Sequence, residues 1–207
     1  MIKKLTENAR EPRGIWGTLM IKKMNKGHAR MTRWAFDSLN IKEDDTILDI
    51  GCGGGNAVSI LEKLAAKGKV YGIDYSALSV EKASARNKRA IMQGRVKILN
   101  ASVSSLPFQD KSVELATAVE TIYFWPDLKN DFKEVYRVLK DGGRFCVVCE
   151  MVKNSDGTGN HAEVAEFLKL HYLSQDEIER LFISAGFKNI TIRRDNQNGW
   201  LSATGIK

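Results

Sequence analysis

The sequence predicts an α/β fold, with a doubly wound, seven-stranded and mostly parallel sheet, helices on both faces and an antiparallel hairpin at its C-terminal end. Between residues 46 and 151, short apolar runs alternate with longer amphipathic segments, a pattern typical of parallel strands joined by right-handed helical crossovers. The apolar runs are nearly continuous, as expected of strands that are covered on both faces. The last forty residues add two strand candidates that are close together in sequence, which indicates a hairpin.

The individual elements follow from local signals. Seven runs are typical of strands, at residues 46–52, 69–75, 96–101, 113–120, 144–151, 188–195 and 200–206. Five segments have helical spacing, at residues 57–67, 77–92, 128–139, 162–172 and 174–186. Gly68 is a plausible stop for the first helix, and Ser174 with Glu177 forms a capping box that opens the last one.

The N-terminal region has its own helical pattern. Large side chains recur every three or four positions, at Trp16, Met20, Met24, His28, Met31 and Trp34. This spacing predicts an amphipathic helix that packs on the sheet, and a lid over a ligand would need the same apolar inner face. We therefore divide the chain into an N-terminal helical lid, residues 1–45, and one globular domain, residues 46–207.

Composition and charge narrow the class of protein. With 207 residues and 43% hydrophobic content, the chain can bury one sizeable core. It has no apolar run long enough to span a bilayer and no secretory signal, so we expect a cytoplasmic protein without a membrane partner. The net charge of +7 is spread along the chain, which favours a solvated basic surface over a nucleic-acid-binding face.

Neither the cysteines nor the histidines predict a metal site. Cys146 and Cys149 lie three positions apart in an apolar strand, where they point to opposite faces and do not converge on an ion. We expect them to be buried, reduced thiols. The three histidines have no ligand spacing.

The sharpest functional signal is a glycine-rich loop, DIGCGGG, that runs from Asp49 to Gly55 between the first strand and the first helix. Glycines there allow a tight turn and let the backbone approach a ligand closely. The next strand ends in Asp74, 21 residues after Gly53, where a carboxylate can accept the hydroxyls of an adenosine ribose. Together the two signals favour an adenosine-containing ligand over an ordinary glycine turn.

The dinucleotide fingerprint G-x-G-x-x-G is the competing interpretation of this loop. Counted from Gly51 it needs glycine where Asn56 stands, and counted from Gly53 it needs glycine where Val58 stands. The loop instead begins with Asp49, a carboxylate that suits a ligand with a cationic amino group and sulfonium and would repel a pyrophosphate. A nicotinamide-dependent oxidoreductase is therefore disfavoured.

With these motifs, residues 42–151 resemble the class I S-adenosylmethionine-dependent methyltransferases, which have a Rossmann-like fold, and in particular the small-molecule branch that includes quinone-biosynthesis methyltransferases. The C-terminal hairpin resembles the family more loosely. The resemblance implies S-adenosylmethionine as the cofactor and S-adenosylhomocysteine as its product. It places the following residues at the cofactor: Asp49, Gly51, Cys52, Gly53, Gly55, Asp74, Tyr75, Ser76, Ala101, Ser102, Val103 and Glu120.

Two further segments resemble the family with changes. Residues 101–108 are similar to the segment that closes on adenine, with Ser102 where the family has Asp. Residues 113–127 are similar to the fourth strand and the turn that faces the transferred methyl group. In that turn Tyr123 and Phe124 replace the family's usual pair of histidines.

Methyl transfer from a sulfonium is an in-line displacement in which alignment supplies much of the catalysis, and an acceptor that carries a proton also needs a base. The catalytic residues we predict are Glu120, His28 and Tyr123, with His171 and Glu150 as further candidates. Glu120 is best placed, at the carboxyl end of the fourth strand. For it we favour binding of the cofactor's amino end over the role of base.

The predicted acceptor pocket is apolar and aromatic, lined by Trp16, Met20, Met24, Tyr123, Trp125 and Tyr172. Such a lining favours a small organic acceptor. We expect a monomer or a homodimer, without nucleic acid as a partner. Two alternatives stay open, a methyltransferase that acts on RNA or protein, and a non-catalytic protein that binds S-adenosylmethionine on the same fold.

Overall fold

The computed structural model describes residues 12–154, 156–159 and 161–207, so the first eleven residues of the predicted lid lie outside it. The chain divides into two compact units, Met1–Ser102 (unit 1) and Val103–Lys207 (unit 2). The seven strands of the described residues belong to one sheet, in the order β3-β2-β1-β4-β5-β7-β6. The pairs β1–β2, β2–β3 and β4–β5 are parallel, and β7 is antiparallel to both β5 and β6. The predicted fold class is confirmed.

Unit 1 is built on three parallel strands, β1 (Thr46–Ile50), β2 (Lys69–Asp74) and β3 (Val96–Asn100). The inner positions of β1 and β2 are buried, as the apolar runs predict. The register pairs Ile50 with Ile73 and Asp74 with Asn100. The carboxyl ends of the three strands therefore meet at one edge, which brings the glycine loop after β1 next to Asp74.

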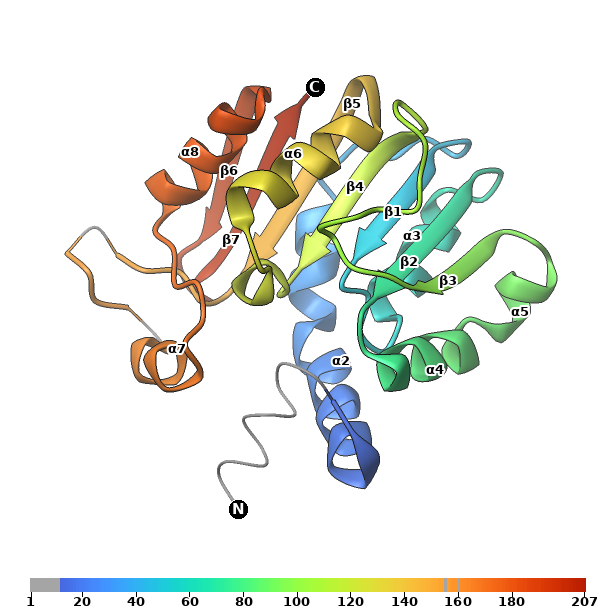
Figure 1. Cartoon of the computed structure of the whole chain (residues 1–207), viewed down its shortest axis with the longest axis horizontal. Coiled ribbons are helices and arrows are strands. Elements are labelled where there is room, and N and C mark those ends of the chain that lie inside the picture. Colours follow the sequence, from blue (N-terminus) through green and yellow to red (C-terminus); the bar gives the residue numbers. More distant parts are fainter. Residues whose placement is uncertain (1–11, 155, 160) are drawn as a thin grey trace. The chain divides into compact units, whose positions relative to one another are not determined.

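The described residues of unit 1 form four helices, α2 (Gly14–Phe36), α3 (Asn56–Leu64), α4 (Ala77–Arg86) and α5 (Lys88–Met92). Helix α3 packs against β1 and β2, and α4 packs against β2 and β3 (Figure 1). The prediction of one helix over residues 77–92 is wrong, because the helix breaks at Asn87. The Asn87 side-chain amide donates hydrogen bonds to the Ala83 and Gly55 carbonyls, and this residue leaves helical geometry.

Unit 2 contains β4 (Val113–Val119), β5 (Leu139–Cys149), β6 (Lys188–Asp195) and β7 (Trp200–Ile206). The predicted C-terminal hairpin of β6 and β7 is confirmed. Strand β5 begins at Leu139, ahead of the predicted start at Arg144. Leu139 already pairs with Val113, and the register is irregular between this pair and the next one, Leu115 with Arg144.

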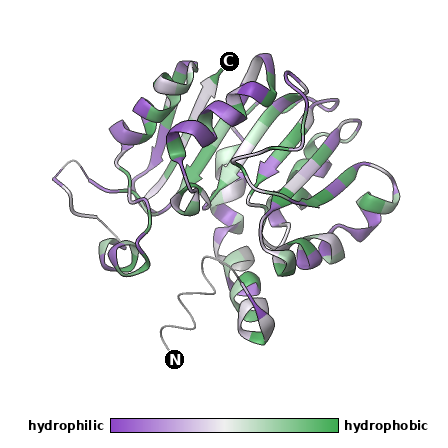
Figure 2. Ribbon diagram, viewed as in Figure 1, coloured by the Kyte–Doolittle hydropathy of each residue, from purple (hydrophilic) through white to green (hydrophobic). Residues whose placement is uncertain are grey.

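The helices of unit 2 are α6 (Leu128–Val138), α7 (Ala162–Leu168) and α8 (Gln175–Ala185), with a short 3₁₀ turn at Ile122–Phe124. Helices α6 and α8 cover the same face of the strands (Figure 1), and their outward sides are largely hydrophilic while β4 and β5 are mostly hydrophobic (Figure 2). Helix α7 ends at Leu168, earlier than predicted, because Lys169 has a left-handed backbone conformation with φ of 52°.

Aromatic side chains form the centre of the unit 2 core. Phe132 lies 5.1 Å from Phe145 and 5.2 Å from Phe182, measured between ring centroids. Trp125 stacks on Phe145 and meets Phe132 edge to face. Trp125 is only 4% exposed, so its packing is that of a core residue, although we predicted it to line the acceptor pocket.

All three cysteines are free and buried, which confirms the predicted burial of Cys146 and Cys149. Cys146 lies 3.5 Å from the Ser202 hydroxyl. Burial raises the pKa of the Cys146 thiol and, more strongly, that of the Cys149 thiol, which keeps both protonated at neutral pH. Within the described residues, no helix is both long enough and apolar enough to cross a bilayer.

The capping box of α8 gives a first testable prediction. The Ser174 hydroxyl accepts a hydrogen bond from the Glu177 N–H at 3.2 Å, and the Glu177 carboxylate accepts one from the Ser174 N–H at 2.8 Å. We expect Ser174→Ala to lower the free energy of unfolding by about 1 kcal/mol in urea titrations. The control is Ser184→Ala near the other end of α8, where alanine favours the helix and no loss is expected. Equal losses in both variants would contradict the role of the cap.

Candidate functional site

The glycine loop of unit 1 has a backbone that other residues adopt only with strain. Gly51, Gly53 and Gly55 have φ values of 70°, 52° and 75°, all in the left-handed region. Among the described residues, a Cβ added at Gly53 would meet no atom within 4 Å, whereas one added at Gly55 would lie 2.5 Å from the Asn87 amide. The loop is therefore open at Gly53 and tightly packed at Gly55.

Asp74 closes the loop from the end of β2. Its carboxylate accepts hydrogen bonds from the Gly53 N–H and the Ser76 N–H, both at 2.9 Å. Burial raises the pKa of Asp74, and the hydrogen bonds from the Ser76 and Gly53 backbone and the Ser79 side chain act in the opposite direction. A carboxylate can accept about four hydrogen bonds, so this fixed group can also accept hydroxyl donors from a ligand.

Three polar side chains that no sequence motif indicates hold this edge of the sheet. Arg86 Nε donates to the Gly54 carbonyl at 3.0 Å, and the Asn87 amide donates to the Gly55 carbonyl at 3.1 Å. The Asn100 amide donates at 2.9 Å to the carbonyls of both Asp74 and Tyr75. All three act on backbone carbonyls far away in sequence, and only a helix break at Asn87 could have pointed to one of them.

Two carboxylates act on the Cys52 thiol in the loop. The pKa of the Cys52 thiol lies well above its ordinary value, mainly through burial and then through the charges of Asp49 and Asp74. Cys52 is thus a protonated thiol in the loop, with two carboxylates close enough to act on it. A cationic ligand is favoured beside these carboxylates, and a pyrophosphate is disfavoured.

The residues predicted on the adenine side have different environments. Tyr75 is 46% exposed, while Ser76 is buried and caps α4 by accepting a hydrogen bond from the Ser79 N–H. The Ala101 N–H donates to the Asp74 carbonyl at 3.1 Å. Ser102 is exposed at the end of unit 1, and Val103, the first residue of unit 2, is buried. Their contact with an adenine ring stays a prediction.

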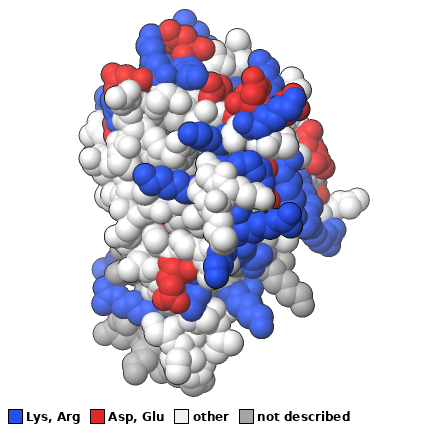
Figure 3. Space-filling view, turned by 90° about the vertical axis from the view of Figure 1, so that its right-hand side faces the viewer, with Lys and Arg blue, Asp and Glu red and all other residues white. Residues whose placement is uncertain are grey.

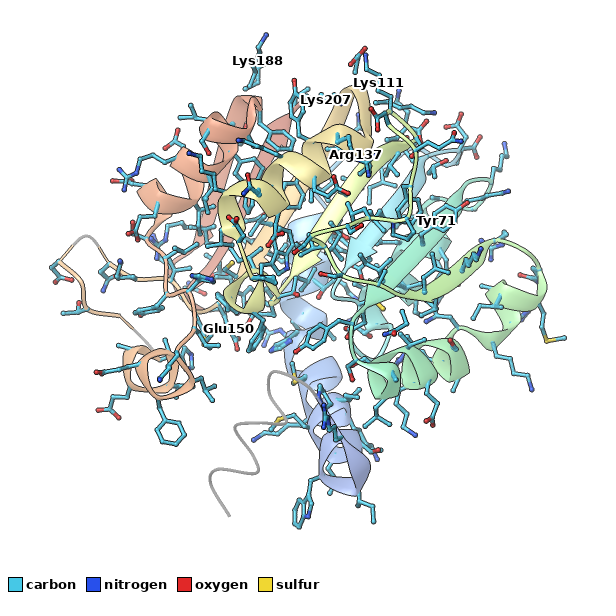
Figure 4. The ribbon with its side chains drawn as sticks, viewed as in Figure 1. Tyr71, Lys111, Arg137, Glu150, Lys188 and Lys207 are labelled. Carbon is cyan, nitrogen blue, oxygen red and sulfur yellow. The ribbon has the colours of Figure 1, made fainter. Side chains whose placement is uncertain are left out.

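Unit 2 holds a second polar cluster, at the carboxyl end of β4. Glu120 is buried and has a φ of 58°, a left-handed conformation that costs a non-glycine residue on the order of 1–3 kcal/mol. Its Oε1 accepts hydrogen bonds from the Tyr123 hydroxyl at 2.9 Å and from the Glu150 N–H at 2.6 Å. Glu150 follows β5 at the end of unit 2 that lies opposite Lys111 and Lys207 (Figure 4).

Tyr123 is the hydrogen-bonding centre of this cluster. Its hydroxyl donates to Glu120 and accepts from the Met151 N–H at 3.1 Å. Burial first, and then repulsion from the ionised forms of Cys149 and Glu120, raise the pKa of the phenol well above its ordinary value. Tyr123 therefore stays protonated at neutral pH and acts as a hydrogen-bond donor to the carboxylate.

The other predicted catalytic and pocket residues are distributed over both units. On α2, Trp16 is exposed, and Met20, Met24 and His28 are half-buried. In unit 2, the Tyr172 hydroxyl donates to the Val152 carbonyl at 3.3 Å, and a ring nitrogen of His171 lies 3.0 Å from the Trp125 carbonyl. The role of these residues toward an acceptor stays a prediction.

The unit 1 residues fit S-adenosylmethionine. The face of the loop at Gly53 is open, and the fixed Asp74 carboxylate beside it suits ribose hydroxyls. The negative charges of Asp49 and Asp74 suit a ligand that carries an ammonium group and a sulfonium. The residues that would hold the cofactor here are the glycines of the loop, Asp49 and Asp74.

Comparison with known proteins agrees with this fit. Residues 48–147 match the methyltransferase domain family. A demethylmenaquinone methyltransferase of Lactiplantibacillus plantarum is 25% identical over 205 residues, covering 87% of this chain and 86% of that protein. An O-methyltransferase of Penicillium expansum is 29% identical over 171 residues, covering 82% of this chain and 61% of that protein.

Solved structures agree in fold. A SAM-dependent methyltransferase from Aquifex aeolicus superposes with a TM-score of 0.72 at 22% identity, covering 90% of this chain and 96% of that one.

The chain spans only 32% to 61% of the length of the first curated relatives it matches, among them a botryococcene C-methyltransferase and a sterol 4-C-methyltransferase. The domain match and the relatives support the class I S-adenosylmethionine-dependent methyltransferase family that the motifs predict, and the solved structure agrees with it in fold.

Proposed function

We propose that the protein transfers a methyl group from S-adenosylmethionine to a small organic acceptor by in-line displacement. The observation that carries this proposal is the pairing of the open, left-handed Gly53 with the Asp74 carboxylate that its N–H contacts. When bound, the cofactor supplies a methyl group that the adjacent sulfonium already activates. The protein has to bind, align and exclude water rather than generate a strong nucleophile.

The two polar clusters have distinct roles in this proposal. In unit 1, Asp74 accepts the ribose hydroxyls, and Asp49 and the loop set the negative potential that favours a cation. In unit 2, Glu120 holds the cationic amino group of the cofactor, and proton removal from the acceptor is its alternative role. The alternative predicts that Glu120→Gln lowers kcat and leaves the affinity for the cofactor unchanged, whereas the favoured role predicts weaker cofactor binding.

We further propose a lipophilic acceptor. Curated relatives are named for botryococcene, a sterol and demethylmenaquinone. Met20 and Met24 are half-buried, adaptable side chains of the kind that line apolar pockets.

The test uses S-adenosylmethionine labelled in its methyl group, incubated with the protein and a crude cell extract, which is then divided into organic, protein and nucleic acid fractions. We expect label in the organic fraction with the wild type and none with Asp74→Ala. Label in the RNA or protein fraction would overturn the small-molecule acceptor. Cofactor binding without transfer into any fraction would identify a non-catalytic binding protein.

Tyr123 gives a prediction for the unit 2 cluster, as a residue that positions Glu120. Tyr123→Phe removes one donor to Glu120 and the acceptor of the Met151 N–H. We expect a loss of about 1–3 kcal/mol in the free energy of unfolding, from the groups left unpaired. We also expect kcat to fall by about tenfold, because a misplaced carboxylate misaligns the reacting groups.

The matched control is Tyr136→Phe, on α6 in the same unit, where no comparable change in kcat is expected. Both variants are compared well below their unfolding temperatures, so that a lower fraction of folded protein cannot lower kcat. An unchanged kcat in Tyr123→Phe would show that the hydroxyl only stabilises the fold.

A further inference from the structure

The N-terminal end of α2 exposes three large apolar side chains. Ile15 is 80% exposed, Trp16 57% and Leu19 54%. Single exposed apolar residues are common on protein surfaces, but three within five positions of one helix form a patch that favours contact with an apolar partner.

The same side of α2 continues as a basic stripe. Lys22, Lys23, Arg30 and Arg33 are exposed, and the helix contains no Asp or Glu from Gly14 to Phe36. At about 100° per residue, the apolar and basic positions together occupy about a third of the helix circumference. The opposite side is buried, through Ile21, Met31, Ala35 and Phe36. The outward face of α2 is therefore apolar near the N-terminal end of the helix and cationic further along the helix.

The charge of this face identifies its partner. A second copy of the chain would bring two basic stripes together, without acidic residues on α2 to neutralise them. A nucleic acid would supply phosphates to the stripe but nothing apolar for Ile15 and Leu19. An anionic lipid bilayer supplies both, since acyl chains accept Ile, Leu and Trp while the headgroups attract Lys and Arg.

We propose that α2 docks on the surface of an anionic lipid bilayer and lies in its interface, with Ile15, Trp16 and Leu19 at the acyl boundary and the basic stripe among the headgroups. The contact is peripheral, and it revises our expectation of a protein without a membrane partner. It rests on residues of α2 alone, and it stands whether or not the proposed methyl transfer is correct.

The test is co-sedimentation of the full chain with vesicles of phosphatidylcholine alone and of phosphatidylcholine mixed with phosphatidylglycerol. We expect binding to the mixed vesicles and at least about tenfold weaker binding to the neutral ones. Ile15→Ser combined with Leu19→Ser is expected to lower binding to the mixed vesicles by about tenfold or more. Met92→Ser combined with Ile183→Ser removes two exposed apolar side chains elsewhere and is expected to leave binding unchanged.

Charge reversals separate docking of α2 from general attraction. Lys22→Glu with Lys23→Glu is compared with Lys88→Glu and Arg89→Glu on α5, which change the net charge equally. The α5 pair lies on the side of unit 1 that carries β3, α4 and α5, where Lys and Arg also gather (Figure 3). We expect a loss of about tenfold or more for the α2 pair and of less than about threefold for the α5 pair.

Several outcomes would overturn the proposal. Equal losses of vesicle binding for both charge reversals would show that the anionic vesicles attract the basic protein in general, without docking of α2. Full binding by the Ile15 and Leu19 variant would show that the apolar patch does not insert. Binding of an RNA oligomer without binding of vesicles would assign the face to a nucleic acid. A dimer that is detected by light scattering and that dissociates in this variant would assign the face to a second copy of the chain. Circular dichroism of each variant checks that these exposed substitutions leave the fold intact.

Discussion

Asp74→Ala is expected to weaken the binding of S-adenosylmethionine by about 100-fold or more. Each hydrogen bond between a hydroxyl and a charged carboxylate contributes about 1.5–3 kcal/mol, and the proposed site loses two of them. The variant also removes the acceptor for the Gly53 and Ser76 N–H groups, which hold the loop in its open form. The measurement is calorimetric titration of both proteins with the cofactor.

Two further variants separate binding from folding. Asp74→Asn keeps a carbonyl acceptor for one of the two N–H groups, so we expect a smaller loss of stability and still a loss in affinity of about tenfold or more. Asp44→Ala removes an exposed carboxylate in the same unit and is expected to bind like the wild type. Wild-type affinity in Asp74→Asn would show that this carboxylate does not bind the cofactor.

The raised pKa of Asp74 gives the pH dependence a definite sign. Because burial raises the folded-state pKa above its unfolded value, Asp74 adds stability below the unfolded pKa, and this contribution is lost as the pH rises through the folded-state pKa. Cofactor binding needs the charged form and should change in the opposite direction. We therefore expect affinity to fall as the pH decreases through the raised pKa, and this dependence to be absent in Asp74→Asn.

Gly55→Ala is expected to have the largest effect on stability, a loss of about 3 kcal/mol or more in the free energy of unfolding. Gly55 has a φ of 75°, and an added Cβ would lie 2.5 Å from the Asn87 amide and 2.8 Å from the Ala83 Cα. The Ala83 Cα is part of the backbone of α4, so relief requires the helix or the loop to move. Urea titration of the two proteins measures the loss.

The matched control is Gly94→Ala, where φ is 70° and the added Cβ meets no described atom within 4 Å. Its cost should be that of the left-handed backbone alone, about 1–2 kcal/mol. Gly53→Ala, with a φ of 52° and the same open surroundings, should cost about as much in stability and should also weaken cofactor binding, because its Cβ points into the open face. Equal costs at Gly55 and Gly94 would contradict the close contact with α4.

The sequence predicts the position of the glycine loop beside Asp74, because its signals are local. A glycine run after an apolar strand, and an acid at the end of the next strand, place the loop beside Asp74 once the strands are parallel. Arg86, Asn87 and Asn100 could not be found this way, since they bind backbone carbonyls that are more than twenty residues away. Such contacts depend on tertiary packing, which a sequence motif does not encode.

In unit 2 as well, the features that depend on local sequence patterns could be predicted, and those that depend on tertiary contacts could not. The capping box of α8 and the hairpin of β6 and β7 are local patterns, and both are present. Trp125 packs on Phe132 and Phe145, and its place in the acceptor pocket stays a prediction, because aromatic residues look alike in sequence whether they line a cavity or fill a core. The strained backbone of Glu120 has no counterpart in the sequence, since only tertiary contacts hold a glutamate in that conformation.

The most direct test of the central claim is calorimetric titration of the wild-type protein with S-adenosylmethionine, S-adenosylhomocysteine and NAD under the same conditions. We expect micromolar dissociation constants for the first two and no detectable binding of NAD, because the loop combines an open glycine face with carboxylates that repel a pyrophosphate. Tighter binding of NAD, or no binding of either adenosyl compound, would contradict the assignment of this loop as a methyltransferase cofactor site.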